Sequence, residues 1–245
     1  MIRFPSDYRT VMSTTDELST DRLTRRTVLL SCGSFNPITH MHLRMFELAK
    51  DYLSRYARPQ HVVVEGIISP THDAYETAKR LAPATHRCRM VELGLQPMNA
   101  VPHWVRCSDW EARQPQWPRT LPALDYYKSQ LAPGVGLMFL CGADLFETFN
   151  VPDLWRDEDI RRICADYGLV VITRQGSDPW RTLEKSPKAD ILQEYKNNIF
   201  IVEEKIPNAV SSSAVREAIK CGDSIRYLVP DPVIQYIRDN HLYES

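Results

Sequence analysis

The stretch GSFNPITHMH, residues 33–42, decides the fold because it separates a short apolar run from a long amphipathic one. Residues 27–32 are typical of a buried strand, whereas Ile38, Met41 and Met45 begin an apolar repeat at helical spacing. Gly33 is therefore predicted to lie in a strand-to-helix turn, with Pro37 in the first turn of the helix. Such a turn directs backbone N–H groups and the positive end of a helix dipole at one point, which favours a phosphate group.

The side chains that follow the turn agree with this interpretation. Thr39 and His42 are three residues apart and share a helix face, so the imidazole can lean over an anion held at the turn, whereas His40 points elsewhere. The alternative is an ordinary strand-to-helix connection with a solvated histidine, because a single glycine is a weak phosphate signature.

Apolar strand patterns and helical patterns alternate from residue 27 onward, which predicts an α/β fold with a parallel sheet covered by helices on both faces. The predicted strands are 27–32, 61–68, 101–107, 137–141, 168–173 and 198–203. The predicted helices are 38–56, 84–95, 119–131, 156–165, 212–221 and 231–240. The proline-containing stretches 97–122 and 179–187 are predicted to be irregular walls or lids.

A ligand site is expected where strands of a parallel sheet end. Gly33, residues 69–75, residues 108–117, and Gly142 with Asp144 all follow predicted strands. Asp144 has two candidate roles, which are an acceptor for ribose hydroxyls and the N-cap of a helix that starts at Leu145.

Composition limits the classes of partner. The 245 residues, 43% of them hydrophobic, suffice for one domain over 27–245, and the polar residues 1–26 are expected to form a flexible leader. With 30 Lys and Arg against 31 Asp and Glu, no overall field recruits nucleic acid or an anionic membrane. No run approaches the roughly 20 apolar residues of a membrane span, and no secretory signal is recognisable.

These features favour an intracellular protein and leave the choice between cytoplasm and nucleus open. The six cysteines show no CxxC spacing, which favours reduced thiols over metal ligands or disulfides.

A second hydroxyl-rich bend precedes the helical pattern that ends near Gly222. One hydroxyl among Ser211, Ser212 and Ser213 can cap this helix while neighbouring N–H groups meet phosphate oxygens. Arg216 follows one turn later and offers a planar fork for the same oxygens. Taken alone, a serine-rich start of an amphipathic helix is usually only a cap.

Five segments resemble the eukaryotic nicotinamide/nicotinate mononucleotide adenylyltransferases, in the same order, from about Val28 to Tyr243. They are GSFNPITHMHLRMFELAKDYL, GIISPTHDAY, LCGADLFETFNVPDLW, ADYGLVVITR and VSSSAVREAIKCGDSIRYLVPDPVIQYI. The family patterns GxFxPxTxxH and ISSTxxR correspond to residues 33–42 and 210–216, with Val210 for isoleucine and Ser213 for threonine. The resemblance implies a Rossmann-like nucleotidylyltransferase fold.

The resemblance also implies the reaction, which is transfer of AMP from ATP to nicotinamide mononucleotide, with nicotinate mononucleotide as a further acceptor, giving NAD or its deamido form and pyrophosphate. His42 and Arg216 would be the catalytic contacts to the ATP phosphates, and Mg²⁺ would accompany the triphosphate without a protein ligand cluster. The expected ATP and phosphate contacts are Gly33, Ser34, Phe35, Thr39, His42, Lys79, Asn208, Ser211, Ser212, Ser213 and Arg216.

The implied contacts to the mononucleotide and to NAD include two tryptophans, whose faces attract a cationic pyridinium ring. They are Ser34, Phe35, Trp117, Thr120, Gly142, Asp144, Leu154, Trp155, Arg174 and Glu204. Relatives carry a lysine pair after the Asp-Ala-Tyr of this chain, where residues 76–80 read ETAKR, so the phosphate-binding cation is Lys79 or Arg80, with Lys79 preferred. The basic tract that some relatives insert between Tyr127 and Leu137 is missing from this sequence.

Two other functions stay open at this stage. One is the same chemistry with another acceptor, and the other is a nucleotide-binding, chaperone-like scaffold with weak catalysis. The expected partners are small molecules, namely ATP and the mononucleotide, and the sequence does not decide whether the chain forms a homo-oligomer.

Overall fold

Six parallel strands form one sheet in the order β3-β2-β1-β4-β5-β6. The computed structural model describes residues 24–75, 81–96, 104–206 and 208–244. The strands are β1 (Arg25–Gly33), β2 (His61–Pro70), β3 (Val105–Cys107), β4 (Gly136–Gly142), β5 (Leu169–Ile172) and β6 (Ile199–Val202). The order reverses between β1 and β4, and this reversal is the point at which such sheets open a crevice at their carboxyl edge.

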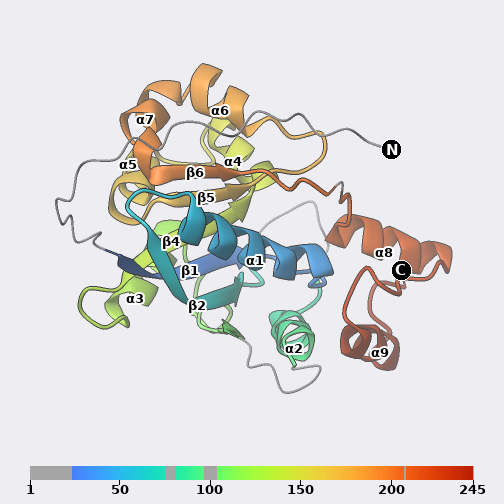
Figure 1. Cartoon of the computed structure of the whole chain (residues 1–245). Helices are drawn as coiled ribbons and strands as arrows, with labels where there is room; N and C mark the ends of the chain where they lie inside the picture. Colours follow the sequence, from blue (N-terminus) through green and yellow to red (C-terminus); the bar gives the residue numbers. More distant parts are fainter. Residues whose placement is uncertain (1–23, 76–80, 97–103, 207, 245) are drawn as a thin grey trace, which may run out of the picture.

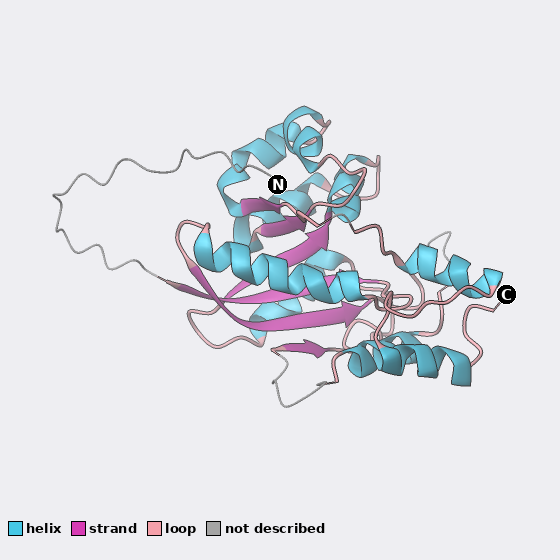
Figure 2. Ribbon diagram, turned by 45° about the vertical axis from the view of Figure 1, so that its right-hand side comes forward, coloured by secondary structure: helices cyan, strands magenta, loops and turns pink. Residues whose placement is uncertain are grey.

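Helices cover both faces of this sheet (Figures 1 and 2). They are α1 (His40–Arg55), α2 (Ala84–Gly94), α3 (Thr120–Ser129), α4 (Ala143–Glu147), α5 (Asp157–Arg162), α6 (Pro179–Lys185), α7 (Ala189–Glu194), α8 (Ser212–Cys221) and α9 (Asp231–Asp239). Short segments of other helix types are η1 (Thr148–Asn150), η2 (Ile163–Tyr167) and η3 (Lys196–Asn198).

The alternation of side chains along β4 divides the interior into two cores. Met138 and Leu140 belong to the core shared with α1, α2 and α9, whereas Leu137, Phe139 and Cys141 belong to the core shared with α3, α5 and α7. Successive residues of a strand face opposite sides, so one apolar run supplies both layers. The α/β class and the helices on both faces are therefore confirmed.

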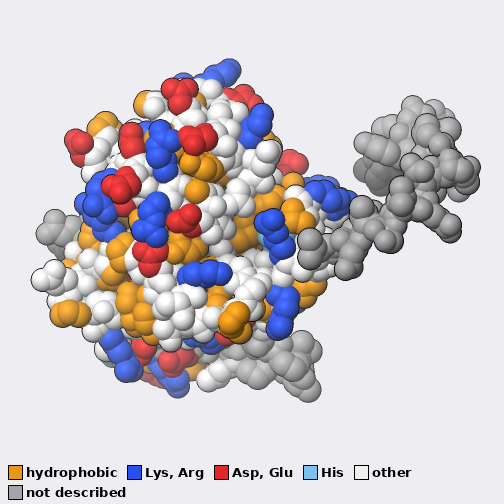
Figure 3. Space-filling model, turned by 90° about the vertical axis from the view of Figure 1, so that its left-hand side faces the viewer, with side chains coloured by type: hydrophobic (Ala, Val, Ile, Leu, Met, Phe, Trp, Pro, Cys, Tyr) orange, Lys and Arg blue, Asp and Glu red, His pale blue; other side chains and the backbone are white. Residues whose placement is uncertain are grey.

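The surface carries charges of both signs. On the face shown in Figure 3, Lys and Arg side chains alternate with Asp and Glu side chains rather than forming a field of one sign. No helix among the described residues combines the length and the apolar character needed to span a membrane. All six cysteines are free thiols, as the spacing predicts.

Two sequence predictions about helices are wrong in detail. Pro37 does not lie in the first turn of a helix, because α1 begins only at His40, with Thr39 as its N-cap. The stretch 179–187 is not irregular, since Asp178 caps α6 and accepts a hydrogen bond from the Arg181 N–H, and Pro179 opens the helix. Proline there starts a helix instead of breaking one.

One strand boundary also differs from the sequence prediction, and two further predictions concern the leader and Asp144. The strand predicted over 101–107 is observed as β3, Val105–Cys107, and residues 97–103 lie outside the described part of the chain. The expected leader lies almost wholly in residues 1–23, also outside it. Asp144 is not an N-cap, because Gly142 caps α4 and Asp144 lies in the first turn of that helix.

Candidate functional site

The bend between β1 and α1 is held by a reciprocal cap. The Thr39 side chain accepts a hydrogen bond from the backbone N–H of His42, and the Thr39 N–H donates to Nδ1 of His42 at 3.0 Å. Since Nδ1 accepts this hydrogen bond, the neutral ring must carry its proton on Nε2. The cap thus prepares His42 as a hydrogen-bond donor on its Nε2 side.

Phe35 gives the bend its shape. It has a φ of 44°, which is unusual for a residue with a side chain, and its ring is buried beside His42, with 5.2 Å between the ring centroids. A Cβ atom on Gly33 would lie 3.3 Å from the same ring, so a small residue is favoured at the end of β1. The Phe35 side chain is thus a core residue, and a ligand at this bend would meet its backbone.

The second bend packs directly against the first. The Ser212 hydroxyl donates to the carbonyl oxygen of Pro37 at 2.8 Å, and Nη1 of Arg216 donates to that of Asn36 at 2.9 Å. Ser211 caps α8 by accepting from the Ala214 N–H at 3.1 Å, as the serine-rich pattern predicts. The two hydroxyl-bearing bends, far apart in sequence, therefore form one continuous surface.

Three further contacts close this junction. The side-chain oxygen of Asn36 accepts from the Tyr243 hydroxyl at 2.7 Å and from the Ala82 N–H at 3.1 Å. Nη2 of Arg216 lies 3.2 Å from the Ser213 hydroxyl, which orients the guanidinium along the start of α8. The arginine expected to meet phosphate is held in place by the protein.

A cavity of about 300 Å³ opens at the carboxyl ends of β1, β2 and β4. It brings together seven of the predicted contacts, namely Gly33, Ser34, Trp117, Thr120, Asp144, Leu154 and Trp155. The two indole rings are fixed by neighbours: Trp155 donates to the Thr148 hydroxyl at 3.0 Å, and Trp117 lies against Tyr75 with 4.9 Å between centroids. This arrangement suits a flat, cationic ring.

Arg174 connects the cavity to the second bend. Its Nη1 pairs with Asp144 at 2.7 Å, and its Nη2 donates to the Ala209 carbonyl oxygen at 3.3 Å. Asp144 stays largely exposed, so its remaining acceptor positions face solvent. Asp144 and Arg174 therefore connect the aromatic cavity with the segment before α8. A ligand with two nucleotide halves could place one half in the cavity and the other at the second bend.

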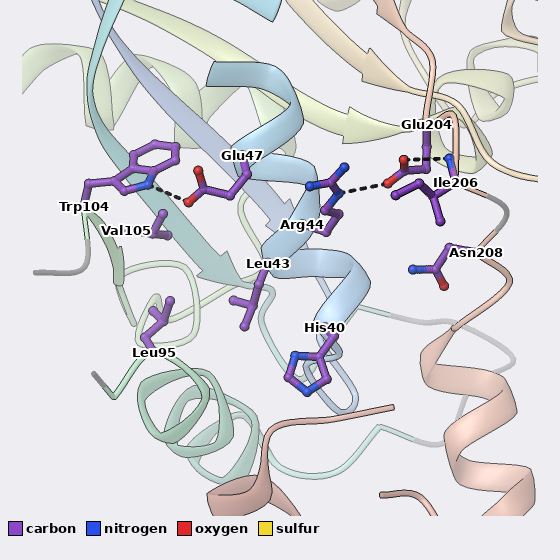
Figure 4. A pocket seen from close by; sticks show the side chains of 10 residues that line it. All are labelled: His40, Leu43, Arg44, Glu47, Leu95, Trp104, Val105, Glu204, Ile206 and Asn208. Carbon is purple, nitrogen blue, oxygen red and sulfur yellow. Dashed lines mark hydrogen bonds and ion pairs between the residues drawn. The ribbon is translucent and has the colours of Figure 1, made fainter. Parts of the chain in front are cut away.

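Glu204 and Asn208 do not reach this cavity. Glu204 pairs with Arg44 of α1 at 3.1 Å and accepts from the Ile206 N–H at 3.0 Å, while Asn208 accepts from the Val210 N–H at 3.0 Å. Figure 4 shows both side chains in a separate groove along α1, on the side of His40. Gly142 is the N-cap of α4 and is not part of the cavity lining, and Lys79 and Arg80 lie outside the described residues.

Sequence reasoning missed Arg87, which is fully buried and joins three segments. It donates to the carbonyl oxygens of Ser34 at 3.0 Å, Thr71 at 2.7 Å and Ala82 at 2.8 Å. It also pairs with Asp73 at 2.8 Å. A signal existed, because Arg87 stands on the apolar face of the predicted helix 84–95, four residues before Val91, where a charge needs buried partners.

Glu111 was missed as well, and no sequence signal marks it. Its side chain is 2% exposed in the cavity wall, and burial raises the pKa of its carboxyl from 4.5. Hydrogen bonds from Ser69 and Cys32, and the charge of Arg87, oppose this shift in pKa without cancelling it. Ionisation of Glu111 in the folded protein thus carries a cost to folding.

We expect this cost to be visible as a pH-dependent difference between wild type and Glu111→Gln. The folded pKa lies above the unfolded one, so the carboxyl supports folding below the unfolded pKa and this support is lost as pH rises through the folded pKa. As the pH rises above the ordinary carboxyl pKa, the free energy of unfolding of wild type should therefore fall relative to that of Glu111→Gln. Urea denaturation of both proteins at a series of pH values measures it, and a constant difference would contradict the raised pKa.

Comparison with known proteins places these features in context. A family model described as cytidylyltransferase-like matches residues 30–218. The chain is 39% identical over 259 residues to nicotinamide/nicotinic acid mononucleotide adenylyltransferase 1 of Bos taurus, covering 89% of each protein. It is 42% identical over 225 residues to the enzyme of that name from Oryza sativa subsp. japonica, covering 89% of this chain and 86% of the other.

Other matches differ in length or similarity. The chain is 41% identical over 254 residues to a nicotinamide-nucleotide adenylyltransferase of Drosophila melanogaster, covering 91% of this chain and 63% of that protein. It also superposes on the structure of Plasmodium falciparum nicotinic acid mononucleotide adenylyltransferase complexed with NaAD, with a TM-score of 0.63 and 18% identity, covering 90% of this chain and 98% of the other. At that identity the superposition supports the fold.

Proposed function

The chain belongs to the nicotinamide/nicotinic acid mononucleotide adenylyltransferases, and we propose that its paired bends and aromatic cavity carry out the reaction of that family. In this reaction a 5′-phosphate oxygen of the mononucleotide attacks the α-phosphorus of ATP. A new P–O bond forms, the bond to the β-phosphate oxygen breaks, and pyrophosphate leaves with the electron pair. The nucleophile belongs to the substrate and is already ionised at neutral pH, so the protein supplies alignment and charge stabilisation.

One observation supports the proposal most strongly, which is the junction of the two bends through Ser212 and Arg216. It gathers backbone N–H groups, hydroxyls and a guanidinium at the edge of the cavity that holds Trp117 and Trp155. Holding two anions in line can lower a barrier by about 7–11 kcal/mol, more than any single side chain here could provide. Positioning is therefore the main contribution that we assign to this site.

Individual roles follow from the geometry. His42 would donate from Nε2 and Arg216 from its guanidinium to the phosphates of ATP. Trp117 and Trp155 would flank the pyridinium ring, with the backbone of Thr120 and Leu154 near its carboxamide. Asp144 would accept from ribose hydroxyls while Arg174 fixes its direction. Glu204 and Asn208 remain proposed contacts although they line the separate groove along α1, and Lys79, outside the described residues, stays a prediction.

Mg²⁺ would enter bound to the triphosphate. We propose that this ion is held mainly by phosphate and water, since Mg²⁺ gives up its bound water reluctantly. Among the described residues no cluster of three His, Cys, Asp or Glu side chains is placed to hold a metal ion. Such an ion would neutralise charge that builds on the departing pyrophosphate.

The function is tested by supplying the protein with ATP, Mg²⁺ and nicotinamide mononucleotide and measuring NAD and pyrophosphate. We expect both products in equal amounts. Tight binding of both substrates without product would instead support a nucleotide-binding scaffold, and turnover only with a different phosphate acceptor would reassign the substrate.

The aromatic cavity makes a separate prediction. Trp155→Ala removes one stacking face, which costs about 1–2 kcal/mol, so the Kd for nicotinamide mononucleotide should rise about tenfold while binding persists. Isothermal titration of the mononucleotide measures this change, and Trp180→Ala, an exposed tryptophan remote from the cavity lining, serves as the control. An unchanged Kd in Trp155→Ala would show that the pyridinium ring does not bind against Trp155 in this cavity.

A further inference from the structure

The wall of the aromatic cavity contains a carboxyl group for which the reaction described above has no use. Glu111 lines the same cavity as Trp117 and Trp155. Its Oε1 atom is inaccessible to solvent and has no hydrogen-bond partner in the described part of the chain. A buried polar atom without a partner costs folding energy, so such an atom beside a ligand cavity calls for an explanation.

Among the described residues, three carboxyl groups line this cavity, and Glu111 differs from the other two. Asp144 is paired with Arg174 at 2.7 Å, and Asp159 is paired with Arg156 at 2.8 Å. Within the residues that the structure describes, Glu111 forms no ion pair. The charge of Arg87 reaches it, but that guanidinium already pairs with Asp73. The wall thus carries one buried acid whose charge the protein leaves largely uncompensated.

The position of this acid is fixed by the sheet. Ser69, near the end of β2, and Cys32, near the end of β1, lie beside the carboxyl and act to lower its pKa. The Ser69 hydroxyl is itself 3.0 Å from the Tyr127 hydroxyl on α3. Because two strand ends and a buried helix hold Glu111, its carboxyl cannot swing away when a ligand enters the cavity.

We propose that Glu111 determines specificity at the ring end of the acceptor, favouring a cationic pyridinium that bears a neutral amide over one that bears a carboxylate. The inference rests on the proposed function, since it assumes that the pyridine ring enters this cavity. Both acceptors bring the positive ring, which compensates the Glu111 charge. The acceptor with a carboxylate on its ring adds a negative charge beside that of Glu111. In a poorly solvated space these like charges repel strongly.

The test is the ratio of kcat/KM for nicotinamide mononucleotide to kcat/KM for nicotinate mononucleotide, with ATP saturating. Glu111→Gln keeps the size and polarity of the side chain and removes its charge, so this ratio should fall about tenfold, or about 1.4 kcal/mol. Glu111→Asp keeps the charge and should retain a preference for the amide. Glu92→Gln, on the exposed side of α2 and paired with Arg89, is the matched control and should leave the ratio unchanged.

The ratio separates specificity from a structural role. If Glu111 only supported the fold, Glu111→Gln would lower kcat/KM for both acceptors equally, and the unchanged ratio would overturn the proposal. The same ratio is measured without catalysis by isothermal titration of each mononucleotide into wild type, Glu111→Gln and Glu111→Asp. Wild type that binds both acceptors but makes no product contradicts the proposed function alone, whereas a Kd ratio that Glu111→Gln leaves unchanged contradicts the role of Glu111.

Discussion

Replacing His42 by alanine is expected to lower kcat by about 10²–10³-fold, because one preorganised donor to the reacting phosphates is lost. The Thr39 N–H occupies Nδ1 of His42, which leaves the protonated Nε2 as the donor in the neutral ring. Release of pyrophosphate with saturating ATP and mononucleotide measures kcat. An unchanged kcat would exclude His42 from the mechanism.

The same variant has a smaller structural effect, which must be separated from the catalytic one. His42 completes the cap of α1, so its removal should reduce the free energy of unfolding by about 1 kcal/mol. That loss leaves the protein folded at room temperature. His40→Ala is the matched control, because His40 is exposed and its side chain lines the α1 groove instead of the cavity. It should keep kcat within about twofold of wild type.

Replacing Arg87 by leucine is expected to give the largest loss of stability, about 3–5 kcal/mol in the free energy of unfolding. The substitution leaves the carbonyl oxygens of Ser34, Thr71 and Ala82 without their donor inside the protein. Each unsatisfied buried acceptor costs about 1–3 kcal/mol, although relaxation and water entry recover part of the sum. Urea denaturation monitored by tryptophan fluorescence measures the change.

Arg89→Leu provides the control on the same helix. Arg89 lies two residues further along α2, is half exposed and, within the part of the chain that the structure describes, pairs only with Glu92. Its replacement should change the free energy of unfolding by less than about 0.5 kcal/mol. Equal effects of the two substitutions would show that the buried hydrogen bonds of Arg87 do not hold the first bend in place.

The sheet and both bends could be predicted because their signals are local. Apolar runs of strand length, such as residues 137–141, alternate with helical repeats, and this alternation alone predicts a parallel sheet with a site at its carboxyl edge. The serine-rich start of α8 likewise predicted its own cap correctly. That the two bends touch each other followed only from the family resemblance, because no local pattern encodes a contact across such a distance.

The errors arise where tertiary contacts or competing caps decide the outcome. The pairing of Thr39 with His42 moved the start of α1 past Pro37, and Asp178 converted a proline-rich stretch into the helix α6. In the site, too, local patterns were predicted correctly and tertiary contacts were not. Side chains at strand ends converged as predicted, whereas Glu204 turned to Arg44 on α1, a partner that sequence patterns do not identify. The role of Glu111 depends on burial, which appears only in three dimensions.

The contact of Tyr243 with Asn36 has a consequence for how the protein is made. The bend over residues 33–39 emerges early from the ribosome, yet Ser212, Arg216 and Tyr243 complete it about two hundred residues later. At the usual pace of about 5–20 residues per second, the nascent chain spends ten seconds or more with an open phosphate loop. Nucleotide can thus stabilise the finished protein but has no complete site on the growing one, so ATP cannot assist the early steps of its folding.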